Sequence, residues 1–302
     1  MPASIVAKII NLHRAQLQGV IELGGIRKVR SLYETVRSEL EAELADLRRG
    51  GKDQTFTAFH LRQVLLQVRD GLKVFQTGLA TELDNNGLAT ATLAQRHVVS
   101  AVKAFEKRFA GTEPVLRLEE AGVFAKVYRD VEPTLLHRYH KLTANYPMPT
   151  LERVRNQLAL SMIKGEGVDQ TVNRIAAKGG LFDREKWRAE RIVRSEGAWA
   201  YGVTNQRALA EVAPQVPGLM KKWVETMDAR TGEDSKELQG QTVAWDAPFV
   251  WMKKTAHGVE RVEMMHGPNR PNDRSCTVPW RQDYHGAPAH PGPVTPTMPR
   301  GL

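Results

Sequence analysis

The sequence has little cysteine and, over its first third, almost no proline. Cys276 is the only cysteine among the 302 residues, which excludes an intramolecular disulfide and a zinc site built from several thiolates. No proline lies between Pro2 and Pro114, so long helices are permitted there. No apolar run approaches the roughly 20 residues that cross a bilayer. Polar residues come too early in residues 1–18 for a secretory signal. We therefore expect the chain to fold in a cytoplasm, or to act in something assembled there.

Basic side chains outnumber acidic ones. Lysine and arginine total 43 against 34 aspartates and glutamates, giving a net charge of +9 and a pI near 9.7. Such an excess attracts polyanions, of which nucleic acid is the most obvious, although an acidic protein surface would also serve as a partner.

Tryptophan and proline divide the chain into three regions. All six tryptophans lie at or after Trp187, and eight of the sixteen prolines fall between Pro268 and Pro299. We predict an α+β protein: a helical N-terminal region over residues 1–148, a smaller helix-plus-antiparallel-sheet domain over 149–284, and an extended proline-rich tail over 285–302. The tail is either a disordered end or an arm that lies in a groove of a neighbouring subunit.

Apolar residues in the first region recur at helical spacing, which predicts amphipathic helices whose stripes form the core. We expect glycine or asparagine to break the chain at Gly24–Gly25, Gly50–Gly51 and Asn85–Gly87, and one or two helices around Pro133. The stripes comprise Ile5, Ile9, Leu12 and Leu17; Val29, Leu32, Val36, Leu40, Leu44 and Leu47; Phe59, Val64, Val68, Leu72 and Phe75; and Leu93, Val98, Val102 and Phe105.

The second region changes from helical to strand patterns. Residues 151–162 predict a helix, Asp169 caps a short one, and Asp183 caps a longer one that ends near Val212. After Pro217 the pattern predicts strands at 223–228, 241–245, 249–254 and 259–264, with a hairpin turn at 255–258.

Several short motifs follow one another in this second region. Arg194-Ser195-Glu196 lies in the longer helix, Lys221-Lys222-Trp223 precedes Asp228-Ala229-Arg230-Thr231, and Leu238-Gln239-Gly240 comes next. PNRPNDRSC closes the series at residues 268–276. In this order the motifs resemble those of the phage Mu protein F-like minor head proteins, also called head morphogenesis proteins, over roughly residues 149–280. Arg270 and Asp273 replace a histidine and a cysteine of that family's final motif, and we expect no metal there.

These residue types suit a buried polar joint that locks a helix, a turn and a loop together. Arg194 offers a fork of donors to Glu196 or Asp228, Arg230 and Thr231 tie the turn to the helix, and Asn272 and Arg274 fasten the loop. Cys276 is interpreted as a part-buried bystander and not as a nucleophile. The complete motif set is Arg194, Ser195, Glu196, Trp223, Asp228, Arg230, Thr231, Gly240, Pro271, Asn272, Arg274 and Cys276.

The resemblance implies a minor capsid protein of a tailed bacteriophage. Such a protein would reside in the virion, contact the portal protein and capsid subunits, and aid head assembly, DNA packaging or DNA ejection, without catalysis, cofactor or membrane. We further expect a basic surface that meets packaged DNA. Its members are Lys8, Arg14, Arg27, Lys28, Arg30, Arg48, Arg49 and Lys52.

Two alternatives stay open. The first is a nuclease-like hydrolase that uses His257, Glu260 and His266, which with Arg274 would surround a phosphate. Alternate strand residues point to opposite faces, however, so neighbours in sequence need not form a cluster, and no zinc-protease, P-loop or hydrolase-elbow motif is present. The second is a free nucleoid-binding protein.

Overall fold

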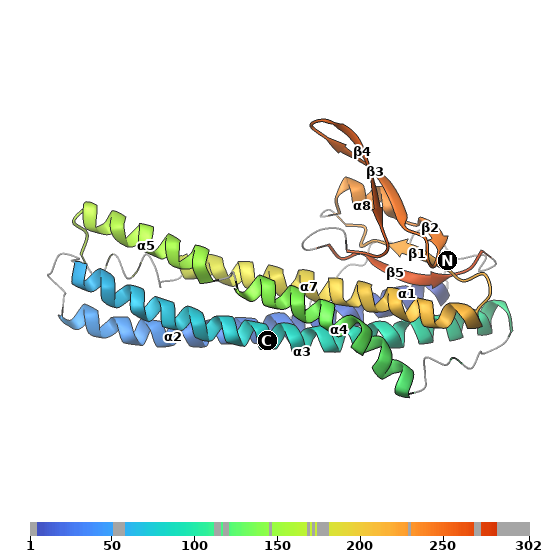
Figure 1. Cartoon of the computed structure of the whole chain (residues 1–302), viewed down its shortest axis with the longest axis horizontal. Coiled ribbons are helices and arrows are strands. Elements are labelled where there is room, and N and C mark those ends of the chain that lie inside the picture. The colour runs from blue at the N-terminus through green and yellow to red at the C-terminus, as the bar shows by residue number, and fades with distance from the viewer. Residues whose placement is uncertain are drawn as a thin grey trace. The chain divides into compact units, whose positions relative to one another are not determined.

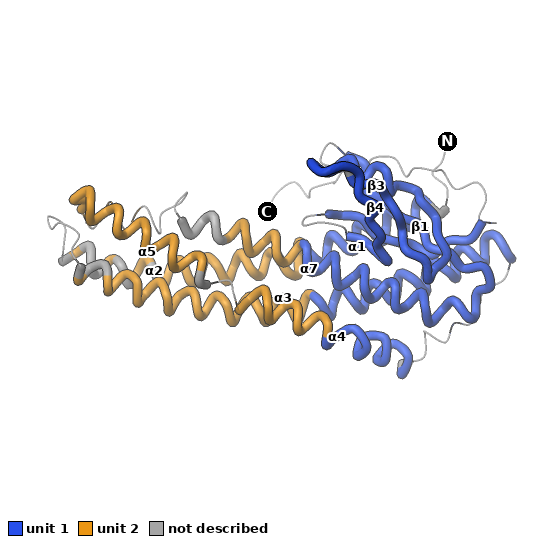
Figure 2. Tube along the Cα trace, turned by 45° about the horizontal axis from the view of Figure 1, so that its top comes forward, with its two compact units in different colours: residues 1–21, 87–133, 195–302 blue, residues 22–86, 134–194 orange. Residues whose placement is uncertain are grey.

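The structure is a computed structural model, and it divides into two compact units (Figure 2). Unit 1 comprises residues 1–21, 87–133 and 195–302, and unit 2 comprises 22–86 and 134–194. The structure describes residues 5–50, 58–111, 116, 121–144, 147–167, 170, 173, 181–228, 231–268 and 273–282.

Helices dominate the described chain, and strands appear only in its last part (Figure 1), so the predicted α+β class is confirmed. None of the described helices combines the length and the hydropathy needed to cross a membrane. Among the described residues up to 215, the helices with bounds are α1 (Ile5–Gly19), the π-helix η1 (Val20–Ile26), α2 (Arg27–Gly50), α3 (Ala58–Phe109), α4 (Ala121–Ala144), α5 (Pro147–Ile163), α7 (Leu181–Val212) and the 3-10 turn η3 (Ala213–Gln215).

Two predicted chain breaks are wrong. Helix α3 continues through Asn85–Gly87, where Asn86 and Gly87 are buried, so packing overrides the weak local preference of these residues for turns. Gly24 and Gly25 lie within η1, and the chain stays helical from Ile5 to Gly50. A Cβ at position 25 would lie 2.5 Å from Cγ1 of Val193, which explains why glycine is needed there.

Unit 2 buries most of the predicted stripes of α2 and α3, but Phe59, at the start of the predicted α3 stripe, is 65% exposed, and that part of the prediction is wrong. Tyr33 of α2 contacts Phe75 of α3 edge-to-face, with ring centroids 6.2 Å apart. The buried side chains include Val29 and Val36 from α2 and Val64, Val68, Leu72 and Phe75 from α3, together with Leu135, Tyr139, Val154, Leu158, Ala189 and Val193. The side chains of Leu40, Leu44 and Leu47 lie outside the described residues.

Helix α1 of unit 1 buries a different face from the predicted one. Its buried positions recur at spacings of three and four residues, as expected for a helix packed on one side. On this face they are Ala7, Ile10, Arg14, Leu17 and Ile21 of the following turn, and His13 beside them is buried as well. The prediction placed Leu12 on the buried face, and it is wrong, because Leu12 is 55% exposed.

Two small antiparallel sheets follow α7. The first has the order β2–β1–β5, with Met220 of β1 opposite both Ala244 of β2 and Trp280 of β5. The second is the β3–β4 hairpin, which turns at Thr255–Gly258 as predicted. The elements are β1 (Met220–Val224), helix α8 (Glu233–Leu238), β2 (Thr242–Ala244), β3 (Phe249–Thr255), β4 (Gly258–Met264) and β5 (Cys276–Trp280).

Strand β5 and helix α8 were not predicted. Pro279 argues against a central strand, but β5 lies at the edge of its sheet, where proline is tolerated. Buried Trp223, Leu238, Phe249 and Trp251 join β1, α8 and β3 into one apolar cluster.

Candidate functional site

Strand β1 carries the first part of the candidate site. Trp223 is fully buried, and its indole Nε1 donates to Oε1 of Glu225 at 2.7 Å. The ring meets Phe249 edge-to-face, with centroids 5.1 Å apart. Glu225 is itself 2% exposed, and its backbone N–H donates to Oε1 of Gln239 at 2.6 Å. Burial, helped by the nearby carboxylate of Asp273, raises the pKa of Glu225 to about 7.

The two lysines before Trp223 behave differently from surface lysines. Lys221 is fully buried, and its Nζ donates to Oε1 of Gln206 at 2.9 Å and to the backbone oxygen of Met265 at 2.7 Å. Burial lowers the pKa of Lys221 to about 8. Lys222, on the other face of the strand, places its Nζ 4.0 Å from the ring centroid of Trp280 in a cation–π contact. Through these contacts both lysines connect β1 to neighbouring elements.

The turn after β1 is closed by a bidentate ion pair. Arg274 donates from Nη1 to Oδ2 of Asp228 and from Nη2 to Oδ1, both at 2.8 Å. The Thr231 hydroxyl accepts from the backbone N–H of Asp228 at 3.0 Å and donates to the backbone oxygen of Thr226. These contacts connect the turn after β1 with the segment that leads into β5.

Helix α1 reaches into the same region through Arg14. Its Nη2 donates to the hydroxyl of Thr226, although the two residues are 212 positions apart. Arg14 is 4% exposed, and burial lowers its pKa while the nearby groups of Cys276, Glu225 and Asp228 oppose that shift. A guanidinium buried in this way is tolerated only where acidic and polar groups surround it.

Helix α7 and the loop before β5 complete the arrangement. Asn205 accepts a hydrogen bond from the hydroxyl of Thr277 at 2.9 Å. The Asp273 carboxylate accepts from the backbone N–H of Ser275 at 3.0 Å and from its hydroxyl at 2.9 Å. We call this set the polar joint. Its members are Arg14, Asn205, Glu225, Thr226, Asp228, Thr231, Asp273, Arg274, Ser275 and Thr277.

The structure brings several predicted motif residues together at the polar joint. Asp228, Thr231 and Arg274 are members, and buried Trp223 and Cys276 lie on the strands beside them. Gly240 has a φ of +80°, and its N–H donates to the Trp223 oxygen at 3.0 Å. Cys276 is 3% exposed and is therefore more deeply buried than predicted. Because burial raises the pKa of its thiol to about 11, Cys276 is not poised as a nucleophile.

Other motif residues lie elsewhere. The guanidinium that binds Asp228 within unit 1 is that of Arg274, and the predicted pairing of Asp228 with Arg194 stays a prediction. Within unit 2, Arg194 donates from Nε to Oε1 of Glu22 at 3.1 Å. Ser195 and buried Glu196 follow it on α7. The remaining predicted residues, Arg230, Pro271 and Asn272, lie outside the described residues.

The predicted basic surface is partly wrong. Arg14 is not on the surface, because it is buried in the polar joint and binds Thr226. Arg30 donates to both carboxylate oxygens of Glu190, at 2.6 and 3.0 Å, and Lys28 lies 3.5 Å from Glu82. The side chains of Lys8, Arg27, Lys28, Arg30 and Arg49 are exposed as predicted, while those of Arg48 and Lys52 lie outside the described residues.

The residues of the nuclease-like alternative are not brought together. His257 is exposed in the turn that precedes β4, whereas His266 follows the other end of this seven-residue strand. At about 3.3 Å per residue the strand alone separates them by roughly 20 Å. Glu260 is exposed on β4. His266 is part-buried, lies edge-on to Trp199, and has a pKa lowered mainly by burial. In the described part of the chain, no three histidine, cysteine or acidic side chains are grouped to hold a metal.

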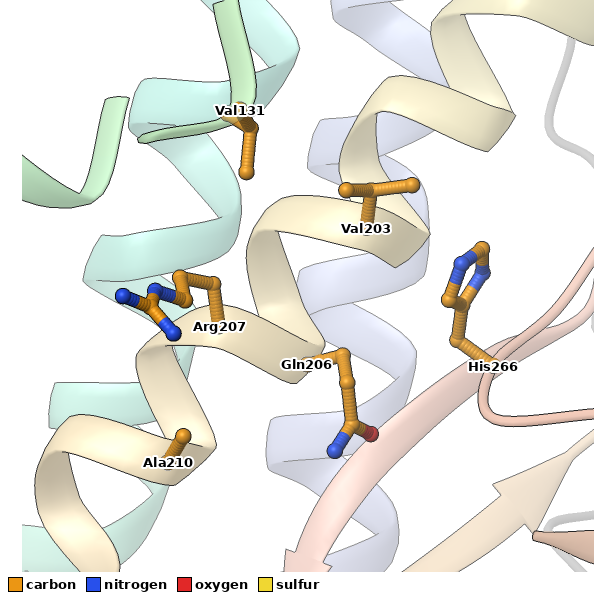
Figure 3. Close-up of a pocket in the computed structure, with 6 residues that line it drawn as sticks. All are labelled: Val131, Val203, Gln206, Arg207, Ala210 and His266. Atoms are coloured by element: carbon orange, nitrogen blue, oxygen red, sulfur yellow. The ribbon is translucent and has the colours of Figure 1, made fainter. Parts of the chain in front are cut away.

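An open hollow of about 270 Å³ lies beside α7 (Figure 3). Its polar groups already have partners, because Arg207 donates to Oδ2 of Asp130 at 2.6 Å and Gln206 donates to the Trp245 oxygen at 2.7 Å. In Figure 3 the Arg207 guanidinium points away from His266. The lining is Val131, Val203, Gln206, Arg207, Ala210 and His266, and we assign no ligand to it.

A second buried polar group in unit 1 had no signal in the sequence. His13 of α1 and His97 of α3 stack with ring centroids 3.8 Å apart and planes 2° apart. Nδ1 of His97 contacts the Tyr201 hydroxyl at 2.9 Å and its Nε2 contacts Oε1 of Gln16 at 2.8 Å, while Nε2 of His13 contacts the Ser100 hydroxyl at 3.0 Å. Each ring therefore has a fixed orientation between the helices.

Comparisons with protein-family models, with curated proteins and with solved structures found no match to this chain.

Proposed function

We propose that this chain is a minor capsid protein of a tailed bacteriophage that aids head morphogenesis. It would be part of the virion, assembled in the cytoplasm of the bacterial host, and would contact the portal protein or the capsid interior. Its role there would be in head assembly, DNA packaging or DNA ejection. The ordered motifs from Arg194 to Cys276, which resemble those of the Mu protein F-like head proteins, are the starting point.

The observation that carries the proposal is the paired Asp228 and Arg274. These residues come from two different motifs of the series, 46 positions apart, and they bind each other through two hydrogen bonds. Trp223 and Gly240, from two further motifs, also bind each other through their backbones. Because the motifs contact one another instead of lining an open cleft, they support a scaffold function better than a catalytic one.

Burial of the polar joint supports the same interpretation. Glu225, Thr226, Asp273, Ser275 and Thr277 are each at most 5% exposed. Side chains enclosed to this degree do not reach a substrate, but they hold strands, turns and helices in one fixed geometry.

The direct test is co-purification with a portal protein. The full chain, tagged, is co-expressed with the portal protein and major capsid protein encoded in the same genome region, and the complexes are separated by affinity and size. We expect the portal protein to co-elute at a fixed ratio. An R274A variant that stays folded but has a loosened joint should co-elute less, whereas an R261A variant, changed on the exposed hairpin, should co-elute normally. Absence of any portal or capsid association for the unaltered chain overturns the proposal.

A further inference from the structure

The two outer edges of the β3–β4 hairpin differ. At the edge of β3, the side-chain amide of Gln241 binds the backbone of Val250 twice: its Nε2 donates to the Val250 oxygen at 2.9 Å, and its Oε1 accepts from the Val250 N–H at 3.1 Å. Lys253 and Lys254 follow on the same strand, and lysines on an edge strand disfavour pairing with other chains. Strand β4 contains neither lysine nor proline, and its register with β3 is continuous, without a bulge. The edge of β4 therefore lacks the protections that β3 has.

The contacts of Val250 also show which backbone groups of β4 point outward. In an antiparallel pair, residues directly opposite each other either exchange both backbone hydrogen bonds or direct these groups to the two outer edges. Val250 directs its groups outward, to Gln241, and it lies opposite Glu263. Glu263, and by alternation Arg261 and Val259, therefore present their N–H and C=O groups at the outer edge of β4. No hydrogen bond from another described element reaches these three backbones.

Side chains are exposed along most of β4, on both faces of the strand. On one face Val259 is 62% exposed, and the side chains of Arg261 and Glu263 are 63% and 48% exposed. Glu260, on the opposite face, is exposed as well. In Figure 1 the turn of the hairpin stands clear of α8 and of the first sheet. An incoming strand therefore reaches this edge without displacing a described element.

Only one twofold register of this edge places opposite charges against each other. When two β4 strands pair antiparallel about a twofold axis, the axis lies at one residue, and outward-facing residues meet each other. An axis at Arg261 or at Glu263 would place like charges opposite each other, which is destabilising. An axis at Val262 instead places Arg261 of each copy opposite Glu263 of the other. Each of these two pairs exchanges two backbone hydrogen bonds.

The side chains on both faces suit this register. Within one chain, Nη2 of Arg261 lies 2.8 Å from Oε1 of Glu263. In the paired strands each guanidinium also has a carboxylate directly opposite, with about 5 Å between the Cβ atoms, so the four charges alternate. On the other face, Val262 of one copy lies opposite Val262 of the second. Because Val262 packs against the apolar cluster that joins β1, α8 and β3, the pairing extends that cluster across the axis.

We propose that the β4 edge binds the β4 edge of a second copy of this chain, antiparallel, with the twofold axis at Val262. The joined sheet has the strand order β3–β4–β4–β3. The proline-rich residues 285–302 are a poorer occupant of the edge, because proline has no N–H for the ladder. A contact through one seven-residue strand per copy is smaller than the roughly 1,200 Å² of stable interfaces, so we expect a dissociation constant on the order of 10–100 µM. At the lower concentrations used to measure unfolding, the chain is therefore a monomer.

The first test exchanges charges at the edge and measures the mass of the full chain by sedimentation equilibrium, from about 5 to 500 µM, which brackets the expected constant. R261E makes positions 261 and 263 both acidic, and E263R makes both basic, so each variant alone should dimerise about tenfold more weakly. An equal mixture of the two variants should recover the dimer, because each acidic position then faces a basic one. The matched control is K236E, which makes the same change of charge in the exposed Lys236–Glu233 pair of α8 and should dimerise like the unaltered chain.

The second test determines the register. In V262C the introduced thiol lies opposite its own copy across the axis, where Cα atoms are about 4.5 Å apart, within the roughly 4.4–6.8 Å that a disulfide spans. Mild oxidation should therefore link V262C into a covalent dimer. The matched control is V259C, because Val259 is well exposed on the same strand but lies opposite Met265 of the second copy, so this variant should stay unlinked. The native Cys276 is 3% exposed and does not compete.

Three results overturn the proposal. The first is an unaltered chain that stays monomeric throughout the concentration range, which would leave the edge to a strand of another protein. The second is a dimer that R261E and E263R each form as readily as the unaltered chain, which would place the contact elsewhere. The third is V259C linking as fast as V262C. If circular dichroism shows that a charge variant is misfolded, the two cysteine variants decide. The inference does not depend on the head-protein assignment, because self-association and portal co-purification are measured separately.

Discussion

Arg274 binds Asp228 through two parallel hydrogen bonds of 2.8 Å, and the two side chains are only 18% and 22% exposed, respectively. A planar guanidinium and a carboxylate in this geometry form one of the stronger polar contacts available to a protein. The pair links the turn that follows β1 to the loop that precedes β5. Because Thr231 closes the same turn, the ion pair acts together with its neighbours.

Removing one partner of this pair should destabilise unit 1. We expect R274A to lower the free energy of unfolding by about 2–3 kcal/mol, because the Asp228 carboxylate is left partly enclosed without its cation. R274K should recover only part of the loss, since an ammonium cannot form the two parallel bonds. Urea unfolding followed by tryptophan fluorescence measures both. The matched control is R261A, which removes an exposed arginine paired with Glu263 on β4 and should cost less than about 0.5 kcal/mol. Equal losses for R274A and R261A contradict the account.

Gly202 on α7 marks a close approach to the loop after β4. A Cβ built there would lie 1.9 Å from the backbone oxygen of Gly267 and 2.8 Å from Nδ1 of His266. G202A should therefore cost more than about 2 kcal/mol, because backbone must move to admit the methyl group. The control is G122A near the start of α4, where no atom lies within 4 Å and the change should be neutral or slightly stabilising. Thermal unfolding of the two variants compares them, and a G202A protein as stable as wild type would show that α7 and the loop are not packed as described.

The stacked His13 and His97 should make the fold sensitive to acid. Burial lowers the pKa of His13 to about 4, and burial together with the charge of His13 lowers that of His97 to about 3. Each folded-state pKa lies below the unfolded value of about 6.5, so the unfolded chain binds more protons and stability falls as the pH drops from about 6.5 toward 3–4. We expect a loss of about 2 kcal/mol per histidine between pH 7 and pH 5.

An H13Q variant isolates this effect from the titration of carboxylates. It keeps a polar side chain near Ser100 but cannot take up the proton, so its free energy of unfolding should depend less steeply on pH than that of the wild type over pH 7–5. The variant L12Q, changed at an exposed neighbouring position of α1, should keep the wild-type slope. Parallel pH profiles for wild type and H13Q would show that the pair does not titrate in this range.

Cys276 provides a probe of unit 1 that needs no engineering, since it is the only thiol in the chain. The residue is 3% exposed, and burial raises its pKa to about 11, so the native thiol should react with Ellman's reagent at pH 8 far more slowly than a free thiol. The rate should rise when urea unfolds unit 1, and it should rise at lower urea in R274A. Immediate stoichiometric reaction of the native protein would contradict the burial of β5.

The fold class and most helical stripes could be predicted, because a helix that packs on one side repeats its apolar residues at three and four positions. Val64, Val68, Leu72 and Phe75 show this pattern and are all buried. Which face of α1 is buried could not be predicted in the same way, because that face includes Arg14, whose partner Thr226 is 212 residues away. Periodicity carries no information about such distant partners.

The candidate site was only partly predictable for the same reason. Asp228 and Arg274 were both expected in a polar joint, yet each was assigned another role, since the sequence offers several arginines and carboxylates and does not show which of them meet. The burial of Glu225, Lys221 and the histidine pair was not predicted, because lysine and glutamate are mostly exposed in proteins and histidine is intermediate, and only the enclosing elements show that these side chains are buried.

The central claim is that this chain is a component of a phage head. The most direct measurement is quantitative mass spectrometry of phage particles produced by a bacterium that carries this gene, purified on a density gradient and treated with nuclease and protease before disruption. The account predicts peptides of this chain in intact particles at a small fraction of the major capsid protein, in a constant ratio to the portal protein. The account would be contradicted if particles containing portal and capsid proteins had no peptide of this chain, and if their immature precursors had none either.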